Sequence, residues 1–299
     1  MPGKSKKRLP FGISYLFPTF STSTSSSSNP ESLFLLEKEA KAVKASKKAF
    51  IMGTNYKLTR DKLDACINDC KKMETTLKSL NYEIHPFYSE TVPECAQVIS
   101  EITSWFASLK DNDIGVFYYS GHGSHVPDQK DKSNSSSKGS EPDGNDEALY
   151  FGPKCFIIDD FLRKQLQKLP ETIRILCIFD CCESGSMIDM PYRYQGLTKN
   201  VDSKHKFKAK IITISGCSDG KVSYEANGSG FLTSSITKVV RGLKRKIRLG
   251  VGSSNIKTWL DFYLKLRENM PGLSDANDDE PQELQLSYSR EEDLENFWL

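Results

Sequence analysis

Two short segments of the chain contain side chains that could do chemistry. One is Gly121-His122-Gly123, and the other holds the adjacent thiols Cys181 and Cys182. The apolar runs Ile114–Tyr119 and Ile173–Phe179 precede them, and such β-branched and aromatic runs predict buried strands. Open α/β sheets assemble their sites at the carboxyl ends of parallel strands. An imidazole and a thiol at that edge are the minimum equipment for a cysteine nucleophile activated by histidine.

The cysteines of the second segment differ in their setting. Cys177 lies inside the apolar run, where a thiol usually acts as a small apolar filler. Cys181 and Cys182 follow the run, and Ser184 and Gly185 come next, which is typical of a turn into a loop. A thiol at such a turn can be exposed and can approach a base.

His122 is the first candidate for that base. Its glycine neighbours leave the ring uncrowded, and the backbone N–H of Gly123 is free to face a ligand. His125 competes for the same role but lies deeper in a polar segment. An ordinary loop histidine remains the alternative for His122.

Composition limits the classes of protein to which the chain can belong. Its 299 residues include 41 Lys and Arg and 39 Asp and Glu, so the formal charge of +2 predicts no nucleic-acid partner. The basic segment 4–8 is either a solvated tail or a nuclear-localisation or anionic-surface patch. No apolar run approaches the roughly 20 residues of a membrane span. We expect a soluble, cytoplasmic protein, with a nuclear location left open by that basic segment.

Cysteine usage points in the same direction. Eight cysteines are too sparse for a disulfide scaffold, and no secretory signal accompanies them. No Cys-x-x-Cys pair occurs, so structural zinc is not expected.

The order of the expected elements indicates the architecture. Residues 1–30 are basic and then Ser/Thr-rich, and we expect a flexible arm there. Strands then alternate with helices, which predicts an α/β fold with a mainly parallel central sheet covered by helices on both faces. The polar stretches 123–144 and 192–208 are expected to lie outside regular elements, with a short apolar piece at Ala148–Phe151. The expected strands are Lys48–Gly53, Glu83–Tyr88, Ile114–Ser120, Ile173–Phe179, Ala209–Ser215 and Glu283–Tyr288, and the expected helices are Glu31–Ser46, Asp61–Leu80, Pro93–Leu109, Asp160–Leu169, Gly230–Arg245 and Ser254–Asn269.

Several motifs occur in a defined order along the chain. They are Cys66-Ile67-Asn68-Asp69, Ser120-Gly121-His122-Gly123, Asp143-Gly144-x-Asp146-Glu147, Ile158-Asp159-Asp160, Asp180-x-Cys182-x-Ser184-Gly185, Met187–Tyr194, Ser215-Gly216-Cys217-Ser218-Asp219, Gly230-Phe231-Leu232-Thr233 and Pro281–Ser287. Together they resemble metacaspases, a family of the caspase-like clan of cysteine proteases, from about Lys47 to the C-terminus. The resemblance implies the caspase-like fold. It also implies one catalytic domain over 31–299, with a large-subunit-like part at about 31–198 and a small-subunit-like part at about 209–299.

This resemblance implies catalytic roles for three residues. Cys182 would be the nucleophile and His122 the base, whereas Cys181 takes a place where many relatives have serine. The backbone N–H groups of Cys182 and Gly123 resemble the oxyanion hole of the family.

The resemblance also implies a substrate pocket. Metacaspases cleave after Arg or Lys, and their pocket acids correspond to Asp69 and Asp180, with Ser120 beside them. A buried pair of carboxylates suits the geometry of a guanidinium. The alternatives are a helix N-cap for Asp69 and a turn residue for Asp180.

A calcium site is a further implication of the resemblance. Asp146, Asp159, Asp160 and Asp189 match acidic positions that bind Ca²⁺ in type I members, and loops can supply the oxygen ligands that this ion prefers. Surface acids, with a helix cap at Asp159, are the alternative. The chain is a few residues shorter than the family between Asp146 and Asp159.

We therefore expect a Ca²⁺-dependent, monomeric cysteine endopeptidase that cleaves protein or peptide substrates after Arg or Lys. Glu183 stands where relatives commonly have histidine, and an acid beside the nucleophile raises a thiol pKa. The alternative function is a catalytically weak caspase-like scaffold that binds partner or misfolded proteins.

Overall fold

A computed structural model describes residues 45–127, 145–182, 184, 187–201, 205–216, 229–250, 256–270 and 284–299. They belong to one compact unit, Val43–Leu299. The predicted arm over 1–30, nearly all of the helix predicted at Glu31–Ser46, the polar segment 128–144 and Glu183 lie outside the described residues. The division into large-subunit-like and small-subunit-like parts stays a prediction.

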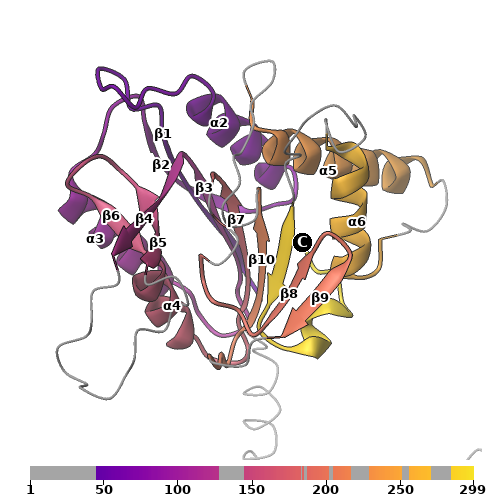
Figure 1. Ribbon diagram of the computed structural model, residues 1–299. Coiled ribbons are helices and arrows are strands. Elements are labelled where there is room, and N and C mark those ends of the chain that lie inside the picture. Colours follow the sequence, from indigo (N-terminus) through magenta and orange to yellow (C-terminus); the bar gives the residue numbers. More distant parts are fainter. Residues whose placement is uncertain are drawn as a thin grey trace, which may run out of the picture. The chain divides into compact units, whose positions relative to one another are not determined.

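The larger sheet of the described residues has eight strands. They are β1 (Lys47–Thr54), β2 (Glu83–Ser89), β3 (Ile114–Ser120), β7 (Arg174–Asp180), β8 (Tyr192–Gln195), β9 (Thr198–Val201), β10 (Lys210–Ser215) and β11 (Gln285–Tyr288). Their order is β2-β1-β3-β7-β10-β11-β8-β9 (Figure 1). The first five strands are parallel, and the pairs that involve β11 and β9 are antiparallel. The predicted α/β fold with a mainly parallel sheet is confirmed.

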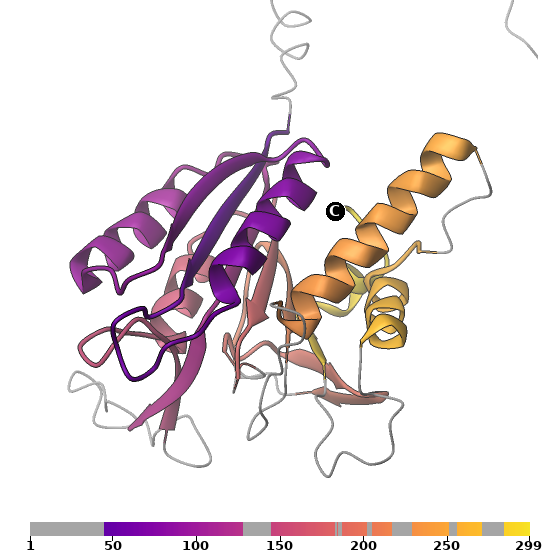
Figure 2. The same ribbon diagram turned by 90° about the horizontal axis from the view of Figure 1, so that it is seen from above.

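Helices cover both faces of this sheet (Figures 1 and 2). One face packs against α2 (Cys66–Lys78), α5 (Phe231–Leu249) and α6 (Trp259–Asn269), and the other packs against α3 (Cys95–Ala107) and α4 (Asp159–Gln167). A short 3₁₀ helix, η1, covers Glu291–Leu294. Strand periodicity explains the two cores, because side chains two apart share a face. Phe50 and Met52 of β1 lie in the α3 side of the core, and Ala49 and Ile51 lie in the α2 side.

A second sheet follows β3 directly. Its strands are β4 (His122–Pro127), β5 (Asn145–Tyr150) and β6 (Phe156–Ile158), and both pairs are antiparallel. The expectation of an irregular segment from Gly123 onward is wrong for residues 123–127. The sequence of β4 does not alternate between apolar and polar residues, because its side chains are only half buried. Backbone pairing with β5 defines this strand.

Two other expectations need correction. The stretch from Tyr192 contains the hairpin β8–β9, whose polar strands lie at one edge of the large sheet. The first helix after β1 begins at Cys66 and not at Asp61. The side chain of Asn55 accepts a hydrogen bond from the Ile67 N–H at 3.2 Å, and Asp69 lies within the first turn of α2. The N-cap alternative for Asp69 is therefore wrong.

A disulfide joins helix α3 to the segment before β6. Cys95, the first residue of α3, is bonded to Cys155, which precedes β6, with a Cα–Cα distance of 5.1 Å. A single crosslink is not a disulfide framework, but this pairing was not predicted from the sequence. Cys177 is a buried free thiol, as expected of a core filler. Of the helices in the described part, none has the length and hydropathy needed to cross a bilayer.

Candidate active site

The pairing of β3 with β7 brings the two chemical segments together. These strands are parallel, and Ser120 lies opposite Asp180 in the register. His122 and Cys182 each come two residues later, where both strands have ended. Both side chains line one cavity of about 210 Å³, together with Ser120, Asp180 and Asp69. The prediction that the strand ends assemble one site is therefore consistent with the geometry.

A backbone carbonyl orients the imidazole of His122. Its Nε2 lies 2.8 Å from the carbonyl oxygen of Asp61, in the segment between β1 and α2. Because a carbonyl oxygen can only accept, Nε2 carries the hydrogen in this contact. The lone pair of the neutral ring then resides on Nδ1. That nitrogen is the one able to take a proton from a thiol.

Two buried tyrosines hold the backbone of His122. Its N–H donates to the hydroxyl of Tyr56 at 2.8 Å, and its carbonyl accepts from the hydroxyl of Tyr119 at 2.8 Å. The rings of Tyr56 and His122 pack with their centroids 4.8 Å apart. Burial raises the pKa of Tyr119, so both hydroxyls stay protonated and keep their hydrogen bonds at neutral pH.

A third tyrosine fixes the segment that carries the Asp61 carbonyl. Tyr150 Oη donates to Asp61 Oδ2 at 2.6 Å, and its own carbonyl accepts from the Tyr56 hydroxyl at 2.5 Å. Burial, followed by the hydrogen bond and charge of Asp61, raises the pKa of Tyr150 to about 12. Asp61, Tyr56 and Tyr150 were missed in the sequence. A carbonyl that orients a side chain has no sequence signature, and Asp61 was placed inside a helix.

The thiol side of the cavity is held by serines and a close backbone contact. Cys181 is buried and Cys182 is half buried. Ser184 Oγ donates to the Cys181 carbonyl at 3.0 Å, and Ser215 Oγ donates to the Ser184 carbonyl at 2.6 Å. A Cβ at Gly123 would lie 1.9 Å from the Cys182 carbonyl oxygen, so only glycine allows β4 to pass this close to the thiol segment.

The buried carboxylates Asp69 and Asp180 form the acidic wall of the cavity. Asp69 accepts hydrogen bonds from the Ser229 hydroxyl and, at 2.9 Å, from the Gly230 N–H. Asp180 Oδ2 accepts from the N–H and hydroxyl of Thr233 at 3.0 and 2.6 Å. Helix α2 supplies one acid, β7 supplies the other, and the start of α5 supplies their donors.

The two acids repel each other electrostatically. Burial, and then the charge of Asp180, raises the pKa of Asp69 to about 7. A Cβ at Gly230 would lie 2.4 Å from Asp180 Oδ2, so a glycine is required where α5 starts against this carboxylate. A cation bound at this wall would favour the charged form of Asp69.

Three of the four acids predicted to bind calcium contact Arg163 of α4, and the fourth, Asp146, acts electrostatically on Asp159. Arg163 Nη1 donates to Asp159 Oδ2 at 2.8 Å and also to Asp189, and its Nη2 pairs with Asp160. Asp159 is the first helical residue and caps nothing, so the cap alternative is wrong. Burial raises the pKa of Asp159 to about 6, with Arg163 opposing the shift and Asp146 adding to it.

Two observations bear on whether these acids could hold a metal ion. Asp159 Oδ1 is buried and has no hydrogen-bond partner, and carboxylate oxygens are the ligands that Ca²⁺ prefers. Within the described residues, however, no three acidic, imidazole or thiol side chains are spaced as ligands of one ion. The Arg163 guanidinium is the cation that these carboxylates hold. Sequence analysis missed Arg163, although its position four residues after Asp159 on a helix was a usable signal.

The other candidate base lies elsewhere. His125 pairs in register with Glu147 along β4 and β5. It is not among the described residues that line the cavity of Cys182. Geometry therefore separates two histidines that sequence alone left open.

The fold and this cavity agree with a comparison to known families. A family model of the caspase domain matches residues 46–277, and the chain belongs to that family. It carries a caspase-like cysteine peptidase domain.

Curated relatives make the assignment more specific. The chain is 35% identical over 167 residues to Metacaspase-1 of Candida albicans, covering 52% of this chain and 36% of that protein. It is 32% identical over 213 residues to Metacaspase-1 of Coccidioides immitis, covering 66% and 44%. The resemblance to metacaspases is confirmed, and the chain spans less than half the length of these two relatives.

A solved structure supports the fold alone. The crystal structure of protein GSU0716 from Geobacter sulfurreducens superimposes with a TM-score of 0.56 at 23% identity. The match covers 82% of this chain and 93% of that one.

Proposed function

We propose that the protein is a cysteine endopeptidase in which Cys182 is the nucleophile and His122 is the base. The observation that carries the proposal is the shared cavity, in which the strand register places both side chains beside two buried carboxylates. The hydrogen on Nε2 leaves Nδ1 of His122 to accept the thiol proton. The resulting imidazolium favours the thiolate, which is the attacking species.

The reaction then proceeds by acyl transfer. The thiolate forms a bond to the peptide carbonyl carbon, and the oxygen becomes an oxyanion. The backbone N–H groups of Cys182 and Gly123 stabilise that charge, an interaction typically worth about 3 kcal/mol. His122 donates its proton to the leaving amine as the C–N bond breaks, and then activates the water that hydrolyses the thioester.

A fluorogenic peptide that ends in Arg tests this proposal. In the presence of Ca²⁺ we expect hydrolysis by the wild type and a loss of at least about 1000-fold in Cys182→Ala. Cys181→Ser is the matched control, because it changes the neighbouring thiol and should retain activity. Hydrolysis that survives in Cys182→Ala would overturn the proposal. A folded wild type without hydrolysis would favour the scaffold function.

We also propose that the enzyme cleaves after Arg or Lys. Asp69 and Asp180 support this specificity, because a buried pair of carboxylates can hold a guanidinium through charge-assisted hydrogen bonds. Ser120 lies on the same cavity, one strand from Asp180. A cation there would reduce the repulsion that raises the pKa of Asp69.

Citrulline gives a sharp test of the specificity, because it keeps the shape of Arg and lacks its charge. We expect the wild type to prefer an Arg peptide over its citrulline analogue by at least about 100-fold. Asp180→Asn can still accept the Thr233 hydrogen bonds, so the fold should persist while the preference falls toward unity. A preference that is unchanged in Asp180→Asn would remove the pocket assignment.

Calcium activation is the third part of the proposal. Asp146, Asp159, Asp160 and Asp189 would hold the ion, which would supply a local positive charge that orders this segment. The buried Asp159 Oδ1, which has no hydrogen-bond partner, supports it. Ca²⁺ and the guanidinium would then compete for the same oxygens.

Calorimetry tests that competition directly. We expect Ca²⁺ binding at millimolar concentration or below, loss of binding in Asp159→Asn, and tighter binding in Arg163→Gln. Absence of binding in both the wild type and Arg163→Gln would contradict the calcium proposal. A monomeric state and a cytoplasmic location stay predictions.

A further inference from the structure

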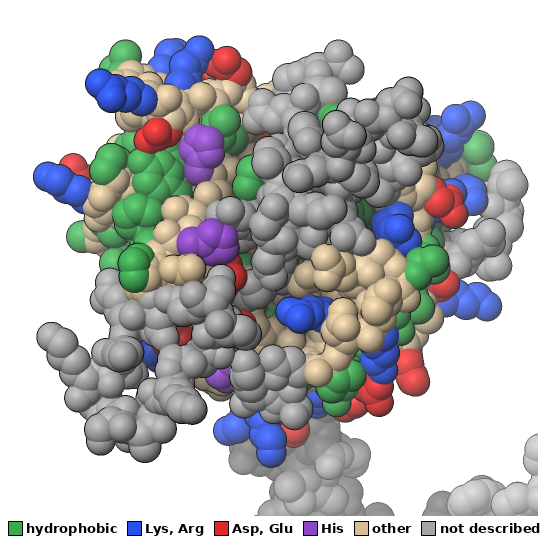
Figure 3. All heavy atoms as spheres, in the orientation of Figure 1, with side chains coloured by type: hydrophobic (Ala, Val, Ile, Leu, Met, Phe, Trp, Pro, Cys, Tyr) green, Lys and Arg blue, Asp and Glu red, His purple; other side chains and the backbone are tan. Residues whose placement is uncertain are grey.

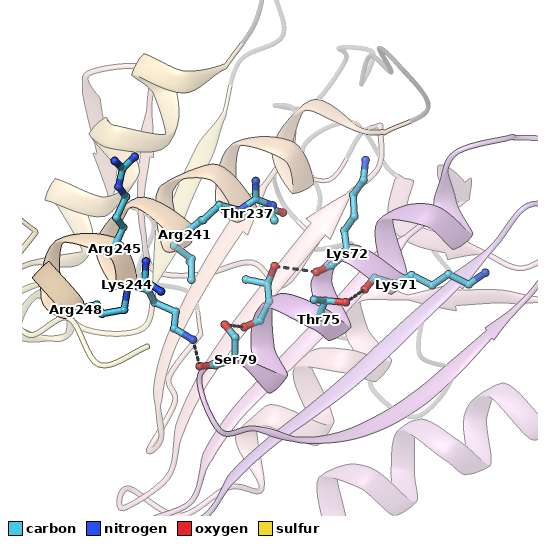
Figure 4. Close-up of a pocket in the computed structure, with 11 residues that line it drawn as sticks. Lys71, Lys72, Thr75, Ser79, Thr237, Arg241, Lys244, Arg245 and Arg248 are labelled. Atoms are coloured by element: carbon cyan, nitrogen blue, oxygen red, sulfur yellow. Dashed lines mark hydrogen bonds between the residues drawn. The ribbon is translucent and has the colours of Figure 1, made fainter.

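A large groove that shares no lining residue with the cavity of Cys182 lies between α2 and α5 (Figure 4). Its volume is about 740 Å³. Of the described residues that line it, six are cationic and none is acidic. These six define the basic groove: Lys71, Lys72, Arg241, Lys244, Arg245 and Arg248.

The hydroxyl groups of the groove are already engaged in the helices. Thr75 and Thr76 donate to the carbonyls four residues earlier at 2.9 and 2.8 Å, and Ser79 donates to Thr76 O at 2.6 Å. Lys244 donates to the Ser79 carbonyl and so ties the two helices across the groove (Figure 4). A ligand of the groove would therefore be recognised by positive charge and not by neutral donors.

The last part of α5 extends beyond the core: Leu243 is half-buried against it, and every residue from Lys244 to the end of the helix is exposed. No residue of this helix after Val240 is buried, although a surface helix normally keeps one apolar face inside. Two large aliphatic side chains in that part, Ile247 and Leu249, are 73% and 56% exposed. Because they are two residues apart on the helix, they project from opposite flanks of the face that lines the groove, at the last turn of α5.

Helix stability alone does not account for this concentration of charge. Cations in the last turn favour the helix dipole, but Arg241, Lys71 and Lys72 lie outside any last turn. Like charges four residues apart on a helix, such as Arg241 and Arg245, repel each other. In Figure 3, positive and negative side chains lie next to each other around the edge of the face shown. A nearly neutral protein, with a net charge of +2, is expected to have such a mixed surface. The basic groove departs from that mixture.

We propose that the basic groove and the exposed end of α5 dock on the surface of an anionic lipid bilayer. The cations would face lipid phosphate and carboxylate groups, and Ile247 and Leu249 would enter the boundary with the acyl chains. Nucleic acid fits less well. The described lining residues include no aromatic side chain for base stacking, and a nucleic acid gives the aliphatic pair no role.

This docking leaves the candidate active site accessible. Thr233, near the start of α5, contacts the cavity acid Asp180, whereas the groove lining begins one turn later at Thr237 and the aliphatic pair lies at the opposite end of the helix. The 19 residues of α5 span about 28 Å. The inference does not depend on the proposed peptidase activity.

Vesicle binding by the full chain tests the proposal. We expect binding to phosphatidylcholine vesicles that contain phosphatidylserine, little binding to phosphatidylcholine alone, and weaker binding as salt increases. Each Lys or Arg near an anionic leaflet contributes about fivefold in affinity. Arg241→Glu/Arg245→Glu should therefore reduce vesicle affinity by at least about tenfold. The matched control, Lys110→Glu/Lys168→Glu, makes the same change of net charge at exposed positions outside the groove and should bind like the wild type.

Ile247→Ser/Leu249→Ser separates a bilayer from a soluble polyanion. This variant should bind vesicles at least about tenfold more weakly, while its binding to a short DNA duplex stays at the wild-type level. Neither residue is buried, so the melting temperature should not change. Three results would overturn the proposal: equal losses in the groove and control variants, an aliphatic variant that binds vesicles normally, or DNA binding stronger than vesicle binding.

Discussion

At the scale of single residues, Asp69 is a carboxyl whose charge is sensitive to its surroundings. It lies in the cavity wall beside Asp180, and burial together with that neighbouring charge raises its pKa to about 7. A carboxyl with this pKa changes charge in the range where a protease works. Its protonation should therefore control the binding of a cationic side chain.

Binding of an Arg peptide should depend on pH in a defined direction. Below the pKa Asp69 is protonated, and above it the carboxylate attracts the guanidinium, so the dissociation constant should fall as pH rises through about 7. The slope should reach at most about tenfold per pH unit on the acidic side. Calorimetry on Cys182→Ala measures binding without turnover. The same titration with Asp69→Asn added should be flatter, and identical slopes in the two proteins would contradict this role.

Tyr150 packs edge-on against the His122 ring, with the centroids 6.1 Å apart, and its hydroxyl acts on the imidazole through Asp61. Its hydroxyl holds the Asp61 carboxylate, and the Asp61 carbonyl orients the imidazole. We expect Tyr150→Phe to lower kcat about tenfold and to leave KM nearly unchanged, because the substrate pocket does not include this hydroxyl.

A second tyrosine gives the control for that variant. Tyr88 also donates to a carboxylate, Glu74, at 2.7 Å, but it lies on β2, away from the cavity. Tyr88→Phe should keep wild-type kinetics. Equal losses of kcat in the two variants would show that a lost phenol-to-carboxylate bond, and not the position of His122, causes the effect.

At the scale of elements, the sequence was sufficient to predict the buried strands that are followed by a candidate catalytic side chain. The runs before His122 and Cys182 are apolar enough to predict β3 and β7, and parallel pairing then brings their ends together. The acidic pocket could be expected only from the resemblance, because Asp69 and Asp180 are far apart in the chain and meet through α2 and β7.

Other elements were not predictable because backbone contacts form them. β4 and the hairpin β8–β9 have polar side chains, and strand pairing alone defines them. The start of α2 was misplaced because residues 61–65 continue a helix-like composition, whereas the Asn55 side chain binds the true N-terminus. Arg163 pairs with acids from two segments, the start of α4 and the loop at Asp189, and their convergence is a tertiary property.

The disulfide between α3 and the small sheet should contribute measurably to stability. Cys95 and Cys155 are 60 residues apart, and constraining a loop of that length in the unfolded chain is worth roughly 4 kcal/mol in the chain-entropy model. Denaturant unfolding should show a loss of about this size in Cys95→Ala/Cys155→Ala. A reductant should destabilise the wild type and leave the variant unchanged. A wild type that is insensitive to a reductant able to cleave the bond would contradict the expectation.

At the scale of the whole unit, α5 links its two candidate functional surfaces. Its first turn holds the acids of the cavity through Thr233 and Gly230, and its last turns carry the basic groove and the exposed aliphatic pair. One rigid helix therefore sets the distance between the proposed peptidase site and the proposed lipid contact. A bilayer bound at one end would present the cavity toward substrates in the surrounding solution.

The account depends most on Cys182 being the thiol that reacts with the substrate. An Arg-terminated peptidyl chloromethyl ketone carries the expected specificity and alkylates a thiolate, and mass spectrometry identifies the modified residue. We predict one adduct, on Cys182, which forms much more slowly in His122→Ala and leaves Cys181 unmodified. An adduct on another cysteine, or an alkylation rate that is unaffected by His122→Ala, would contradict the central claim.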